Sequence, residues 1–205
     1  MEPVPISLGA VILAAGRSSR MGRPKLLLPW GESSVIGHLF WQWRRIGAAQ
    51  IGVVCALGDA GMNAELDRLN FPKSERITNS KPERGMFSSI QRAATWDGWR
   101  PQITHWAIVL GDQPHLRIGT LQTVIDFSAA NPDKICQPRK GGHRYHPVIM
   151  PRRAFQCLQN TTAADLKEFL QSFDAAYCKM DDSGLELDID RPEDYQKALL
   201  LAKNK

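Results

Sequence analysis

The sequence predicts an α/β protein with a largely parallel sheet, because apolar strand-like runs alternate with helical patterns along the chain. The first three runs are apolar almost throughout, as expected of strands that helices cover on both faces. No repeat or long linker divides the 205 residues. We therefore expect one domain over residues 1–205, with residues 139–160 as a substrate-side insertion.

Four runs are expected to form buried strands. They cover residues 8–14, 51–56, 105–110 and 134–137. After the last of them, a polar segment over residues 141–159 breaks the alternation and contains only the short apolar run 147–150. In an open α/β sheet the ligand binds beyond the carboxyl ends of the strands, so the loops that follow these strands are the expected site.

The segments between the strands carry helix signals. Ser33 or Ser34 can cap a helix that Gly47 ends. Further helices are expected over residues 86–96, over residues 120–130 and from Pro192 onward. The tryptophans of these regions are expected to pack in the core: Trp41, Trp43, Trp96 and Trp99.

Composition indicates a globular protein in the cytoplasm. A hydrophobic share of 43% with 23% charged residues is ordinary for this class. No apolar run approaches the roughly 20 residues of a membrane helix. The first residues also lack the basic start and apolar core of a secretion signal. The four cysteines form no CxxC pair, so reduced core thiols are expected rather than a metal site or disulfides.

The net charge of +5 favours an anionic ligand. Nucleic acid is not the expected ligand, because the basic residues are scattered rather than gathered in one stripe. The densest basic clusters, residues 17–25 and 139–144, lie in glycine-containing loops. Such loops suit phosphate better than a DNA groove.

The first strand runs directly into a loop that suits phosphate binding. Small residues from Ala14 to Gly16 allow the backbone to approach a ligand closely. Backbone amides and nearby hydroxyls can then contact phosphate oxygens. The side chains available for this are Ser18, Ser19, Arg17, Arg20 and Lys25. The loop is not a Walker A motif, since Leu26 follows the lysine, and not GxGxxG, since Ser18 replaces the second glycine.

Two acidic residues can hold a metal ion. Asp112 follows the strand 105–110, and a carboxylate at that position faces the ligand crevice, where it could bind Mg²⁺. Gly111-Asp112 is equally compatible with an ordinary turn. The second candidate is Asp190, which can also cap the last helix, and spacing alone leaves Asp188 as an alternative.

The loop pattern L-A-A-G-x-S-x-R-M-G-x-P-K resembles the signature of the MobA-like nucleotidyltransferases, with the molybdenum cofactor cytidylyltransferases nearest in pattern. The resemblance spans residues 11–195. It implies a three-layer α/β/α fold with a mostly parallel, Rossmann-like sheet. It also implies that the nucleotide contacts Leu13, Ala14, Ala15, Gly16, Arg17, Ser18, Ser19 and Lys25.

The same resemblance extends to later motifs. Residues 110–114 look like the metal motif of the family, and residues 188–194 look like its second acidic element, with Arg191 in place of threonine. Asp112 and Asp190 are thereby implied as the metal pair. The nucleotide-side loop is implied to contain Asn79, Gly85, Ser88 and Ser89. His146 and Pro147 match the acceptor loop, although Tyr145 stands where glycine is usual.

The implied activity is Mg²⁺-dependent transfer of a nucleoside monophosphate to a phosphate acceptor, with release of pyrophosphate. Lys25 and Arg20 would balance charge on the reacting phosphates. Ala15 favours CTP, and hence molybdopterin or the molybdenum cofactor as acceptor and a molybdoenzyme or its chaperone as partner. Alternatives are guanylyl transfer, a sugar- or alditol-phosphate acceptor, and a non-catalytic nucleotide-binding accessory protein.

Overall fold

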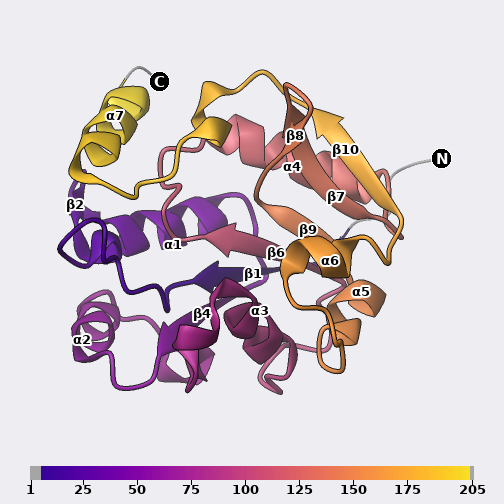
Figure 1. Cartoon of the computed structure of the whole chain (residues 1–205), viewed down its shortest axis with the longest axis horizontal. Coiled ribbons are helices and arrows are strands. Elements are labelled where there is room, and N and C mark those ends of the chain that lie inside the picture. The colour runs from indigo at the N-terminus through magenta and orange to yellow at the C-terminus, as the bar shows by residue number, and fades with distance from the viewer. Residues whose placement is uncertain (1–5, 204–205) are drawn as a thin grey trace.

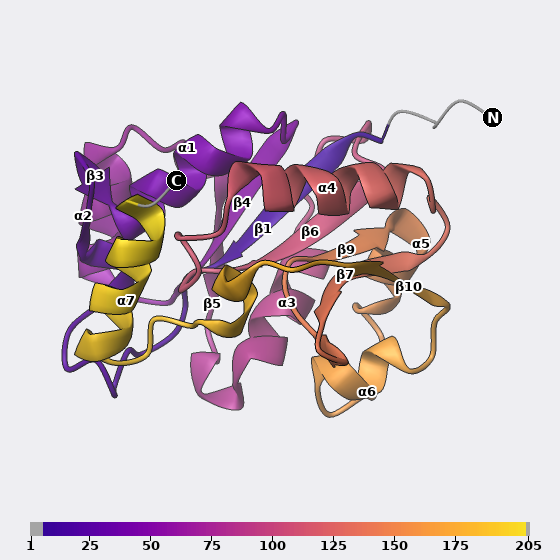
Figure 2. The same ribbon diagram turned by 90° about the horizontal axis from the view of Figure 1, so that it is seen from above.

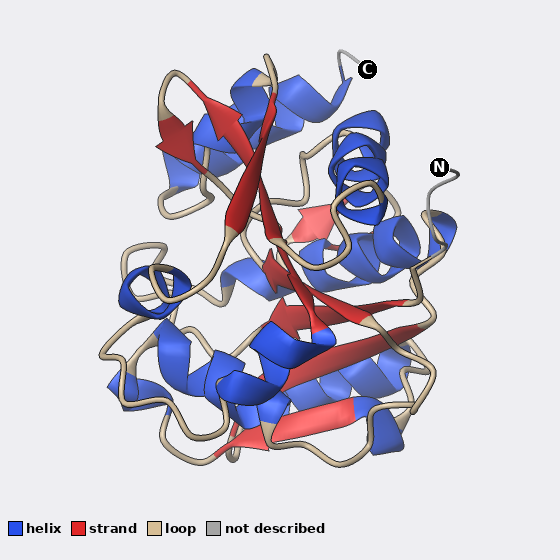
Figure 3. Ribbon diagram, turned by 90° about the vertical axis from the view of Figure 1, so that its right-hand side faces the viewer, coloured by secondary structure: helices blue, strands red, loops and turns tan. Residues whose placement is uncertain are grey.

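The computed structural model describes residues 6–203, in which eight strands form one twisted sheet (Figures 1 and 3). The strand order is β10-β7-β9-β6-β1-β4-β5, and β8 pairs with β7. The strands are β1 Leu8–Leu13, β4 Gln50–Ala56, β5 Arg76–Asn79, β6 His105–Leu110, β7 Ile135–Lys140, β8 His143–Arg144, β9 Val148–Pro151 and β10 Ala175–Lys179. A separate two-stranded ribbon consists of β2 Pro29–Trp30 and β3 Ser33–Ser34.

The parallel part of the sheet brings the loops of distant segments to one edge. Strand β1 pairs in parallel with both β4 and β6, so that Leu13 lies opposite Val54 on one side and Leu110 on the other. Strand β9 is antiparallel to both β6 and β7. The carboxyl ends of β1, β6 and β7 therefore lie at the same edge of the sheet.

Helices cover both faces of the sheet and make three layers (Figure 2). The helices are α1 Val35–Arg45, α2 Ala60–Arg68, α3 Met86–Ala94, α4 Ile118–Ala129, α5 Arg152–Cys157, α6 Leu166–Leu170 and α7 Pro192–Lys203. One core cluster joins the sheet to α1 and α4 through buried residues such as Leu39 and Leu121. The other joins it to α3, α5 and α6 through Ile90, Phe155 and Phe169.

The predicted fold class is confirmed, and most long elements match their predicted positions. Strands β1, β4 and β6 coincide with the predicted runs to within one residue, whereas β7 continues three residues beyond the predicted end at 137. The sequence analysis missed β5, β10, α2, α5 and α6, all of them short. The division into one domain with an insertion at 139–160 stays a prediction, although β9 lies within that segment and pairs in the main sheet.

The predicted core role of the tryptophans is wrong for Trp41. This side chain is 49% exposed, stacks on His38 and lies beneath the guanidinium of Arg45. Trp43, two residues later, is fully buried because α1 turns its face to the sheet there. Trp96 and Trp99 are partly buried against the second core cluster.

The four cysteines are unpaired, as predicted, but the predicted core position is wrong for Cys157, which is exposed because it lies at the last residue of α5, beyond the buried Ala154 and Phe155. Burial raises the pKa of Cys55 to about 12 and that of Cys136 to about 11, so both stay protonated at neutral pH. No helix within residues 6–203 is long and apolar enough to cross a membrane.

The start of α1 depends on Ser34, one of the two predicted caps. Its hydroxyl accepts a hydrogen bond from the Gly37 amide at 3.2 Å, and Gly47, with a φ of +85°, follows the carboxyl end of the helix.

We expect Ser34→Ala to lower the free energy of unfolding by about 1 kcal/mol, because it removes this capping bond. Urea denaturation measures the change. Ser74→Ala, at an exposed serine, is the matched control and should leave stability unchanged. Equal stability of the two variants would contradict the capping role.

Candidate active site

A pocket of about 450 Å³ lies at the carboxyl ends of β1 and β6, beside the amino-terminal end of α3. Two long loops and the start of this helix surround it. Its walls are formed by Leu13, Ala15, Gly16, Arg17, Ser18, Lys25, Leu26, Pro82, Glu83, Gly85, Met86, Ser89, Leu110, Gly111 and Asp112. The pocket therefore occupies the edge of the sheet where a ligand was expected.

The loop after β1 folds back on itself and presents Lys25 to this pocket. The Ala14 amide still donates to Val54 of β4, and Ala14 is buried in the core and does not line the pocket, whereas Leu13 and Ala15 on either side of it do. Ser18 adopts a left-handed backbone conformation with a φ of +50°. Its hydroxyl accepts a hydrogen bond from the Lys25 amide at 3.1 Å, which closes the loop.

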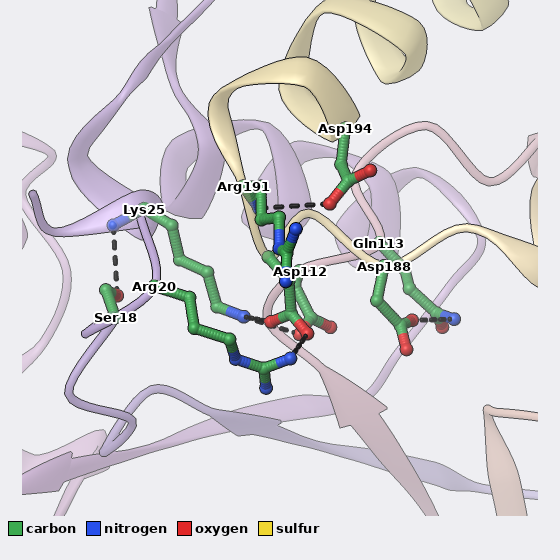
Figure 4. Close-up of polar contacts among 9 residues, drawn as sticks. Ser18, Arg20, Lys25, Asp112, Gln113, Asp188, Arg191 and Asp194 are labelled. Atoms are coloured by element: carbon green, nitrogen blue, oxygen red, sulfur yellow. Dashed lines mark hydrogen bonds and ion pairs between the residues drawn. The ribbon is translucent and has the colours of Figure 1, made fainter. Parts of the chain in front are cut away.

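Lys25 joins the two predicted metal carboxylates (Figure 4). Its Nζ donates to Asp112 Oδ2 at 2.7 Å and to Asp190 Oδ1 at 3.1 Å. Burial lowers the pKa of Lys25, but the charges and hydrogen bonds of Asp112 and Asp190 outweigh burial and raise that pKa above its usual value. Arg20 adds a second cation, 2.7 Å from Asp190 Oδ2.

Asp112 is placed directly after β6 by Gly111. A Cβ atom at position 111 would lie 2.7 Å from the carbonyl oxygen of Leu13 and 2.7 Å from the Leu26 side chain. Only glycine therefore fits between the two pocket loops. Asp112 Oδ1 is buried and has no hydrogen-bond partner within residues 6–203, so one carboxylate oxygen is free to take a further ligand.

The two later aspartates have different surroundings. Asp190 shares Lys25 with Asp112, and the Ile189 amide donates to the Asp112 carbonyl at 3.1 Å, so this segment is fixed beside β6. Asp188 accepts instead from Gln113 Nε2 at 2.9 Å. Burial, followed by the nearby charge of Asp112, raises the pKa of Asp188. This arrangement favours Asp190 as the partner of Asp112.

The residues present fit a hard divalent cation. Asp112 and Asp190 reach one common point, and Asp112 has an oxygen without a partner. Mg²⁺ typically binds one or two carboxylates together with substrate phosphates and waters. Across residues 6–203 no three His, Cys, Asp or Glu side chains gather into a metal-binding group, so a metal bound here would take only this carboxylate pair from those side chains.

On the nucleotide side, Gly85 and Ser89 line the pocket, whereas Asn79 and Ser88 do not. Asn79 is buried and donates from Nδ2 to the hydroxyls of Ser88 and Ser89 at 3.0 and 2.9 Å. Asn79 therefore positions the first turn of α3 rather than facing the pocket. Gly85, with a φ of +87°, permits the sharp entry into that helix.

Three wall residues, Leu26, Pro82 and Glu83, were not singled out by the sequence analysis. The signal that could have found them is position: Leu26 directly follows Lys25, and Pro82 and Glu83 lie just before Gly85. Several predicted residues do not line the pocket: Ala14, Ser19, Arg20, His146, Pro147 and Asp190, which reaches it only through Lys25.

His146 lies beside the site without entering it. Its Nδ1 is 3.2 Å from the carbonyl oxygen of Ile108 in β6. Burial lowers the pKa of His146, although Asp112 partly opposes this effect. Tyr145 stands where relatives usually have glycine. Its amide donates to the carbonyl oxygen of Pro138 in β7 at 3.0 Å, which holds this residue against the sheet.

Residues 10–177 match the model of the MobA-like NTP transferase domain. The chain belongs to this family. It is 24% identical over 190 residues to the molybdenum cofactor cytidylyltransferase of Escherichia coli K12, a match that covers 92% of this chain and 94% of the relative. The family and this relative, together with the pocket, make the chain a nucleotidyltransferase.

Solved structures show the same fold. Rv0371c from Mycobacterium tuberculosis H37Rv is 25% identical, with a TM-score of 0.75 over 96% of this chain and 99% of that protein. Its complex with manganese superposes with a TM-score of 0.71 at 23% identity, over 95% of this chain and 98% of that protein.

We expect Gly111→Ala to lower the free energy of unfolding by about 1–3 kcal/mol, because the added methyl group overpacks the space beside Leu13 and Leu26. Chemical denaturation measures the loss. Gly119→Ala in α4 is the control, since its Cβ meets no other atom within 4 Å. A Gly111→Ala protein as stable as the control variant would contradict the close approach of the two loops.

Proposed function

We propose that this nucleotidyltransferase uses Mg²⁺ to transfer CMP from CTP to the phosphate of molybdopterin or the molybdenum cofactor. The observation that carries the proposal is the contact of Lys25, at the pocket wall, with both Asp112 and Asp190. It combines a cation for phosphate with a carboxylate pair for a divalent metal. Nucleotidyl transfer needs both.

In the proposed reaction, a phosphate oxygen of the acceptor forms a bond to the α-phosphorus of CTP. The bond from that phosphorus to the oxygen that bridges to the β-phosphate breaks, and pyrophosphate leaves. The acceptor phosphate is already ionised at neutral pH, so no general base is needed. Catalysis then depends on alignment and on compensation of negative charge.

Each charged side chain has a part in this scheme. Asp112 and Asp190 would hold the metal, and Mg²⁺ bound there would supply Lewis-acid charge to the phosphates. With the metal bound, Lys25 would be available to the triphosphate. Arg20, which already contacts Asp190, would contribute the second positive charge for the departing pyrophosphate.

The phosphate loop and the helix entry would hold the nucleotide. Gly16 and Ser18 line one side of the pocket, and Gly85 and Ser89 line the other. Leu13, Ala14, Arg17 and Ser19 complete the proposed phosphate loop, while Asn79 and Ser88 support the helix entry from behind.

CTP and a molybdenum cofactor acceptor are favoured by two observations. Ala15 gives the loop the Leu-Ala-Ala-Gly form that in this family goes with cytidylyl transfer, and Ala15 lines the pocket. The E. coli relative, aligned over 94% of its length, is named for the same transfer. His146 and Pro147 are the proposed acceptor-side residues. The proposal includes a cytoplasmic location and a molybdoenzyme or its chaperone as partner, with neither nucleic acid nor membrane involved.

We expect pyrophosphate release to require CTP, Mg²⁺ and the molybdenum cofactor together, and to fall about 100-fold or more in Asp112→Ala, which removes one metal carboxylate. Parallel assays with GTP, ATP and UTP test the base. Asp126→Asn, at an exposed carboxylate on α4, is the control and should keep full activity.

Four outcomes would contradict parts of this proposal. Activity that Asp112→Ala leaves unchanged would contradict the role of Asp112 in metal binding. Equal turnover with GTP and CTP would contradict the preference for CTP. Turnover with a sugar phosphate but not with the molybdenum cofactor would replace the acceptor. Tight CTP binding without turnover on any acceptor would contradict catalysis.

A further inference from the structure

A second basic group lies at the edge strands of the sheet, outside the pocket already described. Arg139 at the end of β7 pairs across the ladder with Arg144 of β8 on one side and with Lys179 of β10 on the other. Figure 1 shows β8 and β10 flanking β7. Directly paired residues point to the same face of a sheet, so the three cations form one row, the basic row.

The basic row is held in place by its turn. Gly141 and Gly142 connect β7 to β8 with φ angles of +55° and +87°. Two left-handed residues in succession are typical of a two-residue hairpin turn that fixes the register of its strands. Arg139 is thereby locked opposite Arg144.

Tyr177 organises the row from the same face. The guanidinium carbon of Arg139 lies 5.9 Å from the ring centroid of Tyr177, and that of Arg144 lies 5.8 Å away. Arg144 Nη1 also donates to the Tyr177 hydroxyl at 3.3 Å. Both guanidinium groups thus converge on one ring before any ligand arrives.

Nothing in the described chain compensates these charges. Like charges directly opposite each other on neighbouring strands destabilise a sheet. Within residues 6–203 no ion pair joins Arg139, Arg144 or Lys179 to an acidic residue, whereas Lys140 on the opposite face contacts Glu186 at 2.8 Å. The row is held by Tyr177 but its positive charge is not neutralised by an acidic side chain, so it suits an anion supplied from outside.

The basic row and the nucleotide pocket share one edge and one face of the sheet. On β7, Ile135 belongs to the core cluster that contains α3 and α6, so Arg139, four residues later, points to that face. Leu13 at the pocket wall packs against the same cluster. His146, beside Ile108 of β6, lies two residues after Arg144 and connects the two regions.

We propose that Arg139, Arg144 and Lys179, organised by Tyr177, bind the far end of the acceptor, and that this acceptor is a small molecule with a second anionic group besides its reacting phosphate. The inference rests on the proposed function, since it assigns the acceptor side of that site. At about 4.8 Å per strand, the row extends from about 5 Å to about 14 Å across the sheet from β6, the strand that Asp112 follows. Acceptors without a second anion, such as neutral alditol phosphates, would leave the row unused.

The test is direct equilibrium binding of the molybdenum cofactor to the full chain, with CTP binding measured in parallel. We expect Arg139→Ala and Arg144→Ala each to weaken cofactor binding about 10-fold or more, because each loses a charge-assisted contact. The affinity for CTP should change less than about 2-fold in these variants. Lys134→Ala is the control: it removes the same charge just before β7, at the opposite edge of the sheet, and should change neither affinity.

Each outcome decides separately for the inference and for the proposed function. Arginine variants that bind the cofactor like the wild type would overturn the inference, as would variants that lose CTP and cofactor affinity together. A wild type that does not bind the cofactor overturns it as well. A wild type whose cofactor binding depends on the row, but which releases no pyrophosphate, supports the inference and contradicts the proposed function.

Discussion

The contact of Lys25 with Asp112 and Asp190 is the interaction on which the site depends, because it joins three segments that are far apart in the sequence. Lys25 comes from the loop after β1, Asp112 from the end of β6, and Asp190 from the segment before α7. The three charged groups are partly buried. Removing one charged partner from a buried group is costly, because it leaves the other charges without compensation. This group therefore fixes both loop positions and the position of the last helix.

The parallel sheet brings Lys25 and Asp112 close together. Strands β1 and β6 are neighbours in register, so their following loops emerge side by side. Gly111 allows those loops to touch, and the Ile189 amide attaches the third segment to Asp112. At the other side of the same edge, the basic row extends the charged surface from β7 to β10. The proposed nucleotide and acceptor sites then lie at the ends of strands of one sheet.

The sequence predicted what is local, and it failed where pairing partners are distant. The run from Leu8 and the run from His105 are apolar and uninterrupted, so their strands could be read directly. Strand β10, with Tyr177 and Lys179, has half-exposed side chains at the sheet edge and lacks that signal. The motifs singled out Lys25, Asp112 and Asp190, but only the fold shows that the ammonium group of Lys25 contacts both carboxylates.

The same limit applies to Asn79 and the basic row. Asn79 was expected to contact the nucleotide, and its buried amide instead holds the hydroxyls of α3, which depends on a helix packing that no spacing reveals. The cluster 139–144 was visible in the sequence as charge. Its alignment with Lys179 and its contact with Tyr177 required the pairing of β7 with β8 and β10.

A crystal structure with Mg²⁺ and a non-hydrolysable CTP analogue tests the central claim most directly. The account predicts that carboxylate oxygens of Asp112 and Asp190 coordinate the metal and that Lys25 Nζ has moved from them to the triphosphate. A metal held elsewhere, or Lys25 still bridging both carboxylates beside a bound nucleotide, would contradict it.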